Sequence, residues 1–532
     1  MQLRQPSTCS EPPNTTGIYS YLESRGGMFP NTVFFGLQYY LKTYFEGPRF
    51  TPADIAQADE FCRQHFGSDL FNRDGWTRLY EKHHGLLPVR IRAVPEGTVV
   101  PLQNVLVTIE NTDPEFPWLT NYLETLLLKV WYPTTVATLS REIKKVIGGF
   151  LERTGDPSLL PFKLHDFGYR GVSSEETAAI GGAAHLINFL GSDTVAGIVL
   201  LQDYYGAKSM PGFSIPASEH STITAWGKEH EVDAYRNMLQ AYPAGLVACV
   251  SDSYNVYNAC EKLWGELLKP DIIHRNGTLV IRPDSGDPVP VLTKVFEILG
   301  EKFGYETNSK GYRVLPPCVR VIQGDGVNMF TIQNMLYQLS KFSGWSADNL
   351  AFGMGGALLQ QLNRDTQKFA FKCSAAQING QWQPVFKDPV TDPGKNSKHG
   401  RLALVEAEPG QFHTMENIQG AELDNEDWLV TVFENGKILV SYDLDSIRER
   451  AQVLLGTPQG RHKSSSERHE HSLSSSRTKR ALADLGLRDE TISAPASSSA
   501  DLLSGHKRRL RNPNSARLEH QGHQSCRIRD RV

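Results

Sequence analysis

From about residue 160 onward the sequence repeats one pattern, and this repetition limits the possible folds more than any other feature. A short run of apolar or β-branched residues ends in a polar turn that contains glycine, and a helix-like segment follows. The polar or glycine residues of these turns fall near positions 170, 193, 220, 252, 284, 325 and 355. Each interval has the length of one strand with its crossover helix.

Seven such units in succession predict an α/β fold, an irregular (β/α) barrel whose active site is built from loops at the carboxyl ends of the strands. A doubly wound open sheet has the same spacing, because spacing alone does not show whether the strands close into a ring. The barrel is the favoured interpretation, and the open sheet is its alternative.

The residues on either side of the repeat have a different pattern. Val99–Asn111 and Trp428–Tyr442 are predicted to be strands joined by turns, and the second contains the hairpin signal Glu434-Asn435-Gly436. Trp118–Trp131 and Ser140–Gly155 are predicted to be helical. We therefore expect both chain ends to form one α+β domain packed beside the barrel. The predicted boundaries are 1–160 and 385–455 for the two parts of that domain, 161–384 for the barrel, and 456–532 for a tail.

The tail differs from the rest of the chain in composition. It is rich in Ser, Arg and His and has 15 Lys and Arg against 8 Asp and Glu, whereas the whole chain has a net charge of −4. Such a segment buries too little apolar surface to fold, so we predict a disordered, basic C-terminal tail. The cluster Lys507–Arg511 has the composition of a nuclear address or nucleic-acid patch, but a solvated run of charge is the favoured interpretation.

Composition also excludes several classes of protein. No run of 18 apolar residues is present, so no transmembrane helix is expected, and Met1–Pro13 lacks the apolar core of a signal peptide. The seven cysteines are scattered without a C-x-x-C pair, so neither a zinc site nor a disulfide framework is expected. The chain as a whole is not basic, which makes nucleic acid an unexpected partner. We predict a cytoplasmic protein, and the basic tail leaves the nucleus open.

The predicted strand ends carry the side chains and turns of a phosphate-binding site. Two glycine-rich turns, Gly324–Gly326 and Gly353–Ala357, each precede a helix-like segment, where backbone amides bind phosphate. Either turn alone is also typical of a plain tight turn, but late barrel strands often supply a phosphate site. The strand ends also supply two cations, five carboxylates and one histidine, namely Arg170, Arg282, Asp193, Glu219, Asp252, Asp284, Asp325 and His220.

Two features leave more than one interpretation open. His220 has no H-x-x-x-H partner, so metal ligation is not expected, and it is either a hydrogen-bonded core histidine or a histidine that meets phosphate. For each of the basic residues at short intervals after the barrel, and for one early in the chain, a solvated surface is the favoured interpretation and a phosphate contact is the alternative. They are Arg364, Lys372, Lys387, Lys395 and Arg25.

Several long motifs carry a specific resemblance. The stretches KLHDFGYRGVSSEETAAIG, GSDTVAG, EHSTITAWGKEHE, VSDSYNVYNACEKLWGE, IRPDSGDPV, VIQGDGV and FKDPVTDPGKNSKHGRLAL closely resemble the nicotinamide phosphoribosyltransferase family of type II phosphoribosyltransferases. The resemblance covers roughly residues 12–455. It implies transfer of a 5-phosphoribosyl group from phosphoribosyl pyrophosphate to nicotinamide in NAD salvage, with nicotinamide mononucleotide and pyrophosphate as products and ATP as an activating co-substrate.

The resemblance also implies a role for each matched residue. Phe167 would stack on the nicotinamide ring, and Asp193 would accept a hydrogen bond from the carboxamide and disfavour the negatively charged nicotinate. His220 would be phosphorylated from ATP. Arg170 and Arg282 would hold phosphate oxygens, Asp252 and Asp284 would lie near the ribose hydroxyls and the Mg²⁺ carried by the diphosphate, and Gly324, Asp325, Gly355 and Gly356 would enclose the 5′-phosphate. In a homodimer with shared active sites, Arg25, Arg364, Lys372 and Lys387 would reach in from the second subunit.

The sequence also departs from the pattern of that family. Met1–Glu11 stands where the family has an Asp-Ser-Tyr-Lys-x-x-His stretch, whose tyrosine would close the other face of the ring. Ala370 and Asp203 stand where a serine and a lysine are expected. These departures motivate a second hypothesis, a catalytically impaired homologue that acts as a binding or signalling protein. A nicotinate or quinolinate phosphoribosyltransferase is a third, which Asp193 argues against because a carboxylate substrate favours a cationic pocket.

Overall fold

The computed structural model describes residues 11–391, 395–418 and 426–452 of the chain. The predicted tail, residues 456–532, and all but the last residue of the segment Met1–Glu11 lie outside the described residues. Within the described ranges, no helix has both the length and the apolar character needed to cross a bilayer.

A parallel sheet of six strands forms the first part of the fold. In sheet order, the strands are β7 (Gly191–Ser192), β6 (Leu164–Asp166), β13 (Leu350–Met354), β12 (Val319–Gln323), β9 (Asn276–Arg282) and β8 (Ala244–Val250). Strand β13 pairs with β6, so the last unit of the repeat lies next to the first. The order of the strands around the sheet is therefore their order along the chain.

Residues 213–218 close this sheet into a ring. Phe213 pairs with Gly191 of β7, and Ala217 pairs with Ala248 of β8, both in parallel orientation. The amide of Ser192 donates to the carbonyl of Phe213 at 2.9 Å, and the amide of Ser218 donates to the carbonyl of Ala248 at 2.9 Å. The two edge strands are thus joined by one extended segment, and the barrel is confirmed over the open sheet.

Helices follow the barrel strands as the repeat predicts. They begin at capping residues: the Ser174 side chain accepts from the Thr177 amide at the start of the first helix, and Asn328 forms a capping box with Thr331 later in the chain. In chain order these helices are α7 (Glu175–His185), α8 (Val195–Tyr205), α9 (His220–Thr224), α10 (Glu231–Ala241), α11 (Val256–Asn258), the π-helix η6 (Ala259–Leu267), α12 (Lys269–His274), α13 (Pro288–Phe303), α14 (Met329–Lys341) and α15 (Gly356–Leu359). Short 3₁₀ turns η3 (Pro157–Phe162), η4 (Tyr169–Gly171), η5 (Lys228–His230), η7 (Ala347–Asn349) and η8 (Arg364–Thr366) and the small hairpin β10 (Glu306–Thr307) and β11 (Arg313–Val314) complete this part.

An antiparallel sheet forms the second part and draws its strands from both chain ends. Its order is β15 (Gln381–Pro384), β14 (Phe369–Ile378), β1 (Thr15–Ser24), β5 (Val105–Asn111), β3 (Val89–Ala93), β18 (Val430–Glu434) and β19 (Lys437–Ile438). Two small two-stranded sheets accompany it, β2 (Asn31–Val33) with β4 (Val99–Pro101) and β16 (Ala403–Glu408) with β17 (Gln411–Met415). The predicted α+β domain built from both ends of the chain is confirmed. The predicted hairpin turn has positive φ at both Asn435 (50°) and Gly436 (81°), as a type I′ turn requires.

The boundary predicted at residue 384 needs correction. Residues 369–384 were assigned to the barrel, but β14 pairs with β1 and β15 pairs with β14, so both strands belong to the antiparallel sheet. The physical reason is that the ring is already complete when β13 pairs with β6. No barrel edge is left for the next strand, which instead pairs along the open side of β1.

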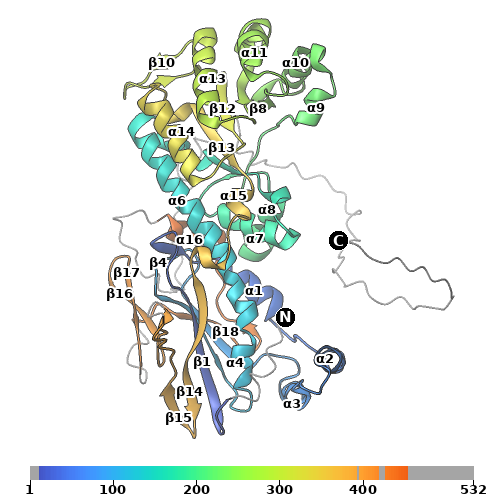
Figure 1. Ribbon diagram of the computed structural model, residues 1–532, viewed down its shortest axis with the longest axis vertical. Helices are drawn as coiled ribbons and strands as arrows, with labels where there is room; N and C mark the ends of the chain where they lie inside the picture. The colour runs from blue at the N-terminus through green and yellow to red at the C-terminus, as the bar shows by residue number, and fades with distance from the viewer. Residues whose placement is uncertain (1–10, 392–394, 419–425, 453–532) are drawn as a thin grey trace, which may run out of the picture. The chain divides into compact units, whose positions relative to one another are not determined.

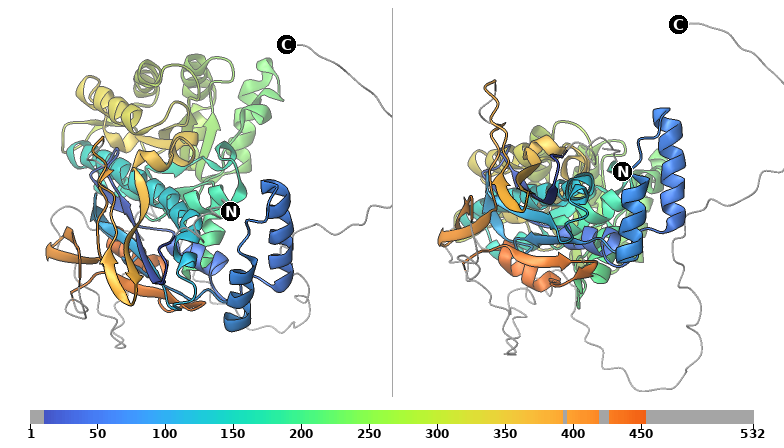
Figure 2. Two further views of the ribbon diagram at one scale, coloured as in Figure 1. Left: turned by 60° about the horizontal axis from the view of Figure 1, so that its bottom comes forward. Right: turned by 90° about the horizontal axis from the view of Figure 1, so that it is seen from below.

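Helix α6 (Trp131–Thr154) connects the two parts. It contacts α7 and α14 of the barrel and β2 of the other part (Figure 1). One cluster of buried apolar side chains includes Ile109 of β5, Ile143 of α6 and Ile281 of β9, so the two parts share a core. The remaining helices are α1 (Leu37–Tyr44), α2 (Pro52–Phe66), α3 (Arg73–His83), α4 (Trp118–Tyr122), α5 (Glu124–Leu127), the 3₁₀ turn η2 (Leu128–Val130) and α16 (Leu444–Ala451). Of these, α2 and α3 pack on each other as a helical pair (Figure 2).

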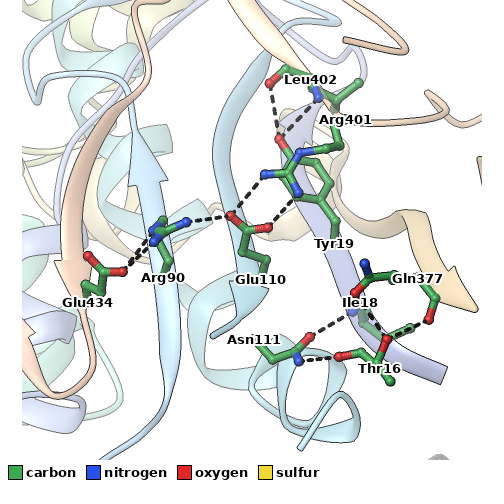
Figure 3. Close-up of polar contacts among 10 residues, drawn as sticks. All are labelled: Thr16, Ile18, Tyr19, Arg90, Glu110, Asn111, Gln377, Arg401, Leu402 and Glu434. Atoms are coloured by element: carbon green, nitrogen blue, oxygen red, sulfur yellow. Dashed lines mark hydrogen bonds and ion pairs between the residues drawn. The ribbon is translucent and has the colours of Figure 1, made fainter. Parts of the chain in front are cut away.

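A network of charged side chains ties distant segments to the antiparallel sheet (Figure 3). Arg401 donates two hydrogen bonds to Glu110 of β5, at 2.8 and 3.1 Å, and its guanidinium lies 5.0 Å from the ring centre of Tyr19. Arg90 of β3 bridges the same Glu110 and Glu434 of β18. Because these residues come from five segments of the chain, the network holds the late segments against the early strands.

Candidate active site at the barrel mouth

Phe167 lies at the barrel mouth, directly after β6. Its amide donates to the carbonyl of Met354 at 3.0 Å, which fixes the backbone between β6 and β13. Its ring covers Gly353: a Cβ atom on this glycine would lie 1.9 Å from Cε2 of Phe167. A Cβ on Gly324 would lie 3.7 Å from the same carbon. The ring therefore occupies the space that a side chain at position 353 would need, whereas a Cβ at position 324 would make an ordinary van der Waals contact with it.

A cluster of charged side chains lies on the neighbouring strand ends. Nε2 of His220 donates to Oδ1 of Asp252 at 2.9 Å, and Nδ1 of His220 lies 3.9 Å from Oδ2 of Asp284. The same carboxylate oxygen of Asp284 lies 3.9 Å from Nη2 of Arg282. Gly324 again makes the approach possible, because a Cβ there would lie 2.8 Å from Oδ1 of Asp284. The structure thus brings these residues and Phe167 into one site.

Two members of this cluster, His220 and Asp252, differ in how much of their side chains solvent can reach. The side chain of Asp252 is only 4% exposed, whereas that of His220 is 43% exposed. A buried carboxylate that holds one nitrogen of an accessible imidazole fixes the tautomer and presents the other nitrogen to a ligand. Of the two interpretations that the sequence left open, the structure disfavours the buried core histidine.

The pKa of Asp284 is raised above its ordinary value of 3.8. Burial is the largest cause, and the negative charges of Asp252 and Asp325 add to it, while Arg282 and His220 oppose it. Three carboxylates are thus close enough to repel one another, and a bound cation or a donated hydrogen bond relieves that repulsion. This end of the site suits a ligand with hydroxyl groups or a divalent cation.

Asp193 follows β7, the strand next to β6. Its side chain is exposed, and its Oδ1 accepts a hydrogen bond from the hydroxyl of Ser214, a residue of the closing segment 213–218. Its amide donates to the carbonyl of Asp166 at 2.9 Å. Asp193 is therefore anchored to the strand end that carries Phe167.

The glycine-rich turn after β13 packs beside the turn that carries Arg170. A Cβ on Gly171 would lie 3.4 Å from Cα of Gly356, and a Cβ on Gly355 would lie 3.4 Å from the carbonyl oxygen of Phe167. Arg170 is exposed, and no atom lies within 4 Å of the position that a Cβ on Gly356 would take. An open backbone beside an exposed arginine is what a phosphate group requires.

The four basic residues expected to act on a second subunit lie elsewhere in the fold. Arg25 follows β1 and pairs with Glu23 at 2.9 Å, while its Nη2 is buried without a hydrogen-bond partner. Lys372 lies on β14, in register with Tyr21 of β1. Arg364 belongs to η8, and Lys387 is exposed after β15. Arg25 and Lys372 therefore belong to the antiparallel sheet and its edge, not to the barrel strands.

Comparison with known proteins identifies the family. The family model of the nicotinate phosphoribosyltransferase (NAPRTase) family matches residues 162–437. The chain belongs to the NAPRTase family. The N-terminal domain of nicotinamide phosphoribosyltransferase matches residues 8–91. The resemblance inferred from the motifs is confirmed.

Two curated relatives cover most of this NAPRTase-family chain. A nicotinamide phosphoribosyltransferase of Xanthomonas campestris pv. campestris is 51% identical over 449 residues, which span 83% of this chain and 95% of the relative. A protein of the same name from Acinetobacter baylyi is 33% identical over 477 residues, 82% of this chain and 93% of the relative. The crystal structure of nicotinate-nucleotide pyrophosphorylase from Pyrococcus furiosus superposes with a TM-score of 0.52 at 17% identity, over 82% of this chain and 88% of that one. At that identity it supports the fold alone.

A cavity of about 430 Å³ lies inside the barrel of this NAPRTase-family protein. Near one end Nζ of Lys163, a buried side chain, donates to the carbonyls of Ala347, Asp348 and Leu350 at 2.8–3.1 Å. Burial lowers the pKa of Lys163 to about 7. The cavity is lined by the inward faces of the strands and by the closing segment, including His165, Ser214, Ile215, Leu246, Val280, Arg320, Ile322 and Ala351.

Sequence reasoning missed several residues that shape the site of this NAPRTase-family chain. Gly353, against which the ring of Phe167 packs, stands in a turn that the sequence singled out for phosphate, and nothing in the sequence showed that an aromatic ring of the neighbouring strand end would cover it. Ser214 and Asp166 gave no signal, because a hydroxyl and a carboxyl in short polar segments are common on any surface. Their importance depends on contacts with Asp193, which lies more distant in the chain: the Ser214 hydroxyl donates to its carboxylate and the Asp166 carbonyl accepts from its amide.

Proposed function

We propose that this phosphoribosyltransferase transfers the 5-phosphoribosyl group of phosphoribosyl pyrophosphate to nicotinamide, which yields nicotinamide mononucleotide and pyrophosphate. The name of the two curated relatives supports this choice of acceptor. Within this chain, the observation that carries it is the exposed carboxylate of Asp193 on the strand next to the one that carries Phe167. A carboxylate accepts a hydrogen bond from an amide NH₂ and repels the carboxylate of nicotinate.

In this proposal the ring nitrogen of nicotinamide attacks C1 of the ribose. The nitrogen lone pair forms the new N–C1 bond, and the electron pair of the broken C1–O bond leaves with pyrophosphate. No general base is needed, because the ring nitrogen carries no proton. Phe167 and Asp193 orient the ring, and Arg170 and Arg282 stabilise the negative charge that develops on the leaving group. Asp252 and Asp284 accept hydrogen bonds from the ribose hydroxyls.

We infer that Mg²⁺ enters this site with the diphosphate of the substrate. Within the part of the chain that the structure describes, no group of three or more His, Cys, Asp or Glu side chains could hold a metal ion by itself. Mg²⁺ in phosphate sites is commonly held by one or two carboxylates together with phosphate oxygens, and Asp252 and Asp284 supply that number. When bound, the ion would neutralise charge on the leaving pyrophosphate.

His220 is proposed to couple ATP to the reaction. Because its Nε2–H donates to Asp252, Nδ1 keeps the lone pair that a phosphoryl transfer needs. The bond between the γ-phosphorus and its bridging oxygen breaks, an N–P bond forms, and ADP leaves. Acid-labile phosphate should appear on the wild-type protein with ATP and be absent from His220→Asn. Phosphate of equal amount on both proteins would assign the acceptor to another residue.

A homodimer is proposed to complete the site. Arg25 and Lys372 belong to the antiparallel sheet, so a partner chain would have to bring them to phosphate, and Arg364 and Lys387 are proposed to act with them. Arg25→Ala and Asp284→Asn should each be inactive alone. After subunit exchange a mixture should regain about one quarter of wild-type activity, because half of the dimers are mixed and each of these holds one intact site. A mixture that stays inactive after proven exchange would refute the shared site.

A cytoplasmic location is proposed on the chemistry of the cysteines. The five described cysteines are free, and burial raises the pKa of Cys260 to about 12. Unpaired thiols suit a reducing compartment. Fractionation of cells with an antibody against the native protein tests the proposal, and recovery of the protein mainly from membranes or medium would contradict it.

The decisive test of function is turnover by the purified full chain. With nicotinamide, phosphoribosyl pyrophosphate and Mg²⁺ we expect the mononucleotide, more efficiently with ATP. Asp193→Asn should weaken the use of nicotinamide and relax the bias against nicotinate. Asp203→Asn is the matched control: Asp203 is an exposed carboxylate on α8, the helix that follows Asp193. Absence of product from a folded sample would favour the impaired homologue, and preferential use of nicotinate would favour the nicotinate enzyme.

A further inference from the structure

Asp166 is a completely buried carboxyl between the two residues assigned to the pyridine ring. It is the last residue of β6, it precedes Phe167, and it pairs with Ser192, which precedes Asp193. Its exposed surface is 0%. A carboxyl so placed touches no substrate, and nothing in the reaction above uses it.

The side chain of Asp166 fixes the turn that carries the aromatic ring. Its Oδ1 accepts a hydrogen bond from the amide of Gly168 at 2.7 Å, across Phe167. A side chain that bonds the backbone two residues onward holds the intervening residue in one conformation. The conformation of Phe167 therefore depends on this oxygen and on the seat at Gly353.

Asp166 also holds the strand end that carries the acidic side chain. Its carbonyl accepts from the amide of Asp193 at 2.9 Å. Its Oδ2 and the hydroxyl of Thr194 are both buried, and neither makes a hydrogen bond of ordinary geometry. A Cβ on Gly182 would lie 3.3 Å from this Oδ2 and 2.9 Å from Cγ2 of Thr194, so the carboxyl of Asp166 and the methyl of Thr194 both lie against this glycine. The Thr194 hydroxyl and the Asp193 carboxylate are close enough to influence the pKa of Asp166.

We propose that Asp166 is a positioning residue for the pyridine pocket, which sets the ring of Phe167 and the carboxylate of Asp193 in one fixed arrangement and so determines nicotinamide affinity. This inference rests on the proposed function, because the pocket is defined by its ligand. It predicts that loss of the Oδ1 acceptor loosens the pyridine site and leaves the phosphoribosyl site intact. A residue that only stabilised the barrel would affect both sites alike.

The test compares Asp166→Ala with Asp166→Asn. Alanine removes the acceptor for the Gly168 amide, whereas asparagine keeps a carbonyl oxygen in the same place. We expect alanine to raise the KM for nicotinamide about ten-fold or more and the KM for phosphoribosyl pyrophosphate less than about two-fold, because misplacement of positioning groups by about 1 Å is costly. Asparagine should restore the nicotinamide KM to within about three-fold of wild type. Equal effects of the two substitutions, or equal changes in both KM values, would overturn the proposal.

A matched control uses the same local hydrogen bond elsewhere. The Oδ1 of Asp156, an exposed residue ahead of β6, accepts from the amide of Ser158 at 2.9 Å, also two residues onward. Asp156→Ala should leave both KM values unchanged. A rise in the nicotinamide KM of this control as large as that of Asp166→Ala would refute the assignment.

A second pair decides the matter if Asp166→Ala does not fold. Thr194→Val removes the buried hydroxyl at nearly constant volume, and Thr194→Ser keeps it. We expect the valine variant alone to raise the KM for nicotinamide about three-fold, because it removes a buried polar group that lies near the Asp166 carboxyl and directly follows Asp193. No difference between valine and serine would refute the proposal.

Direct binding of nicotinamide by calorimetry separates this proposal from the proposed function. If the wild type binds nicotinamide without turnover, the catalytic proposal fails, and the Kd values of the same variants still test positioning. If the wild type binds nicotinate instead, the choice of substrate fails, and the variants are compared with nicotinate. A pyridine Kd unchanged between wild type and Asp166→Ala refutes the positioning role in either case.

Discussion

Asp166→Asn should make the protein more stable at neutral pH, and the size of the gain follows from the buried carboxyl. Burial in the barrel raises the pKa of Asp166 from 3.8 to about 6, with a smaller contribution from the charge of Asp193. The hydrogen bond from the Gly168 amide and the nearby hydroxyl of Thr194 oppose this rise without cancelling it. The folded protein therefore holds a carboxylate in a place that favours the neutral acid.

The sign and the pH range follow from proton linkage. Between pH 3.8 and about 6 the folded state binds the proton of Asp166 more tightly than the unfolded state does, so the free energy of unfolding falls as pH rises. A difference of about two pKa units corresponds to about 3 kcal/mol of lost stability above pH 6. Asparagine carries no charge at any of these pH values. The variant should thus match the wild type below pH 4 and exceed it by up to about 3 kcal/mol above pH 6.

Urea denaturation at several pH values between 4 and 8, followed by tryptophan fluorescence, measures this difference directly. Other titrating groups are the same in both proteins, so their contributions cancel in the comparison. A difference in the free energy of unfolding that is independent of pH would refute the reasoning, and so would a variant less stable than the wild type at pH 8. A stabilised variant would also show that the natural carboxyl is kept at a cost in stability, as is common for residues at functional sites.

Three further predictions concern other parts of the molecule. Gly353→Ala should raise the KM for nicotinamide about ten-fold or more, because the new methyl would displace the ring of Phe167; an unchanged KM would show that the ring is not seated there. Glu110→Gln should lower the free energy of unfolding by about 1–2 kcal/mol, because it weakens the ion pairs with Arg90 and Arg401. The control Glu60→Gln, at an exposed position, should change this free energy by less than about 0.5 kcal/mol. Equal effects of the two substitutions in thermal melts would refute a stabilising role of the Glu110 network. Burial lowers the pKa of Lys163 to about 7, so the folded state binds the proton of this side chain less tightly than the unfolded state does. The stability of the wild type relative to Lys163→Met should therefore rise as pH increases above 7. A difference in urea melts that does not depend on pH would refute this prediction.

Local chemistry accounts for what the sequence predicted well. Strand and helix patterns depend on neighbours a few residues apart, so the ends of the six barrel strands, the turn after residues 213–218 and the turn at Asn435-Gly436 were visible in the chain. Because parallel strands of a barrel end at the same face, the polar residues after them were expected to meet. His220, Asp252, Arg282 and Asp284 do meet there.

Long-range pairing is what the sequence did not show. The sequence predicts a strand end near residue 220, but it does not show that residues 213–218 form only isolated bridges and close the barrel between two edge strands. Strand β14 has the residue pattern of any half-buried strand, so its own sequence did not show whether it joins the barrel or the antiparallel sheet.

The amino-acid sequence by itself thus determined the repeated units, the shared domain of the two chain ends, the family and the set of polar residues at the strand ends. Tertiary structure alone decided that the ring closes, that Gly353 seats an aromatic ring, and that the carboxyl of Asp166 is buried between Phe167 and Asp193. The physical reason is that secondary structure follows from nearby residues, whereas burial and charge coupling arise only when segments far apart in the chain exclude water together.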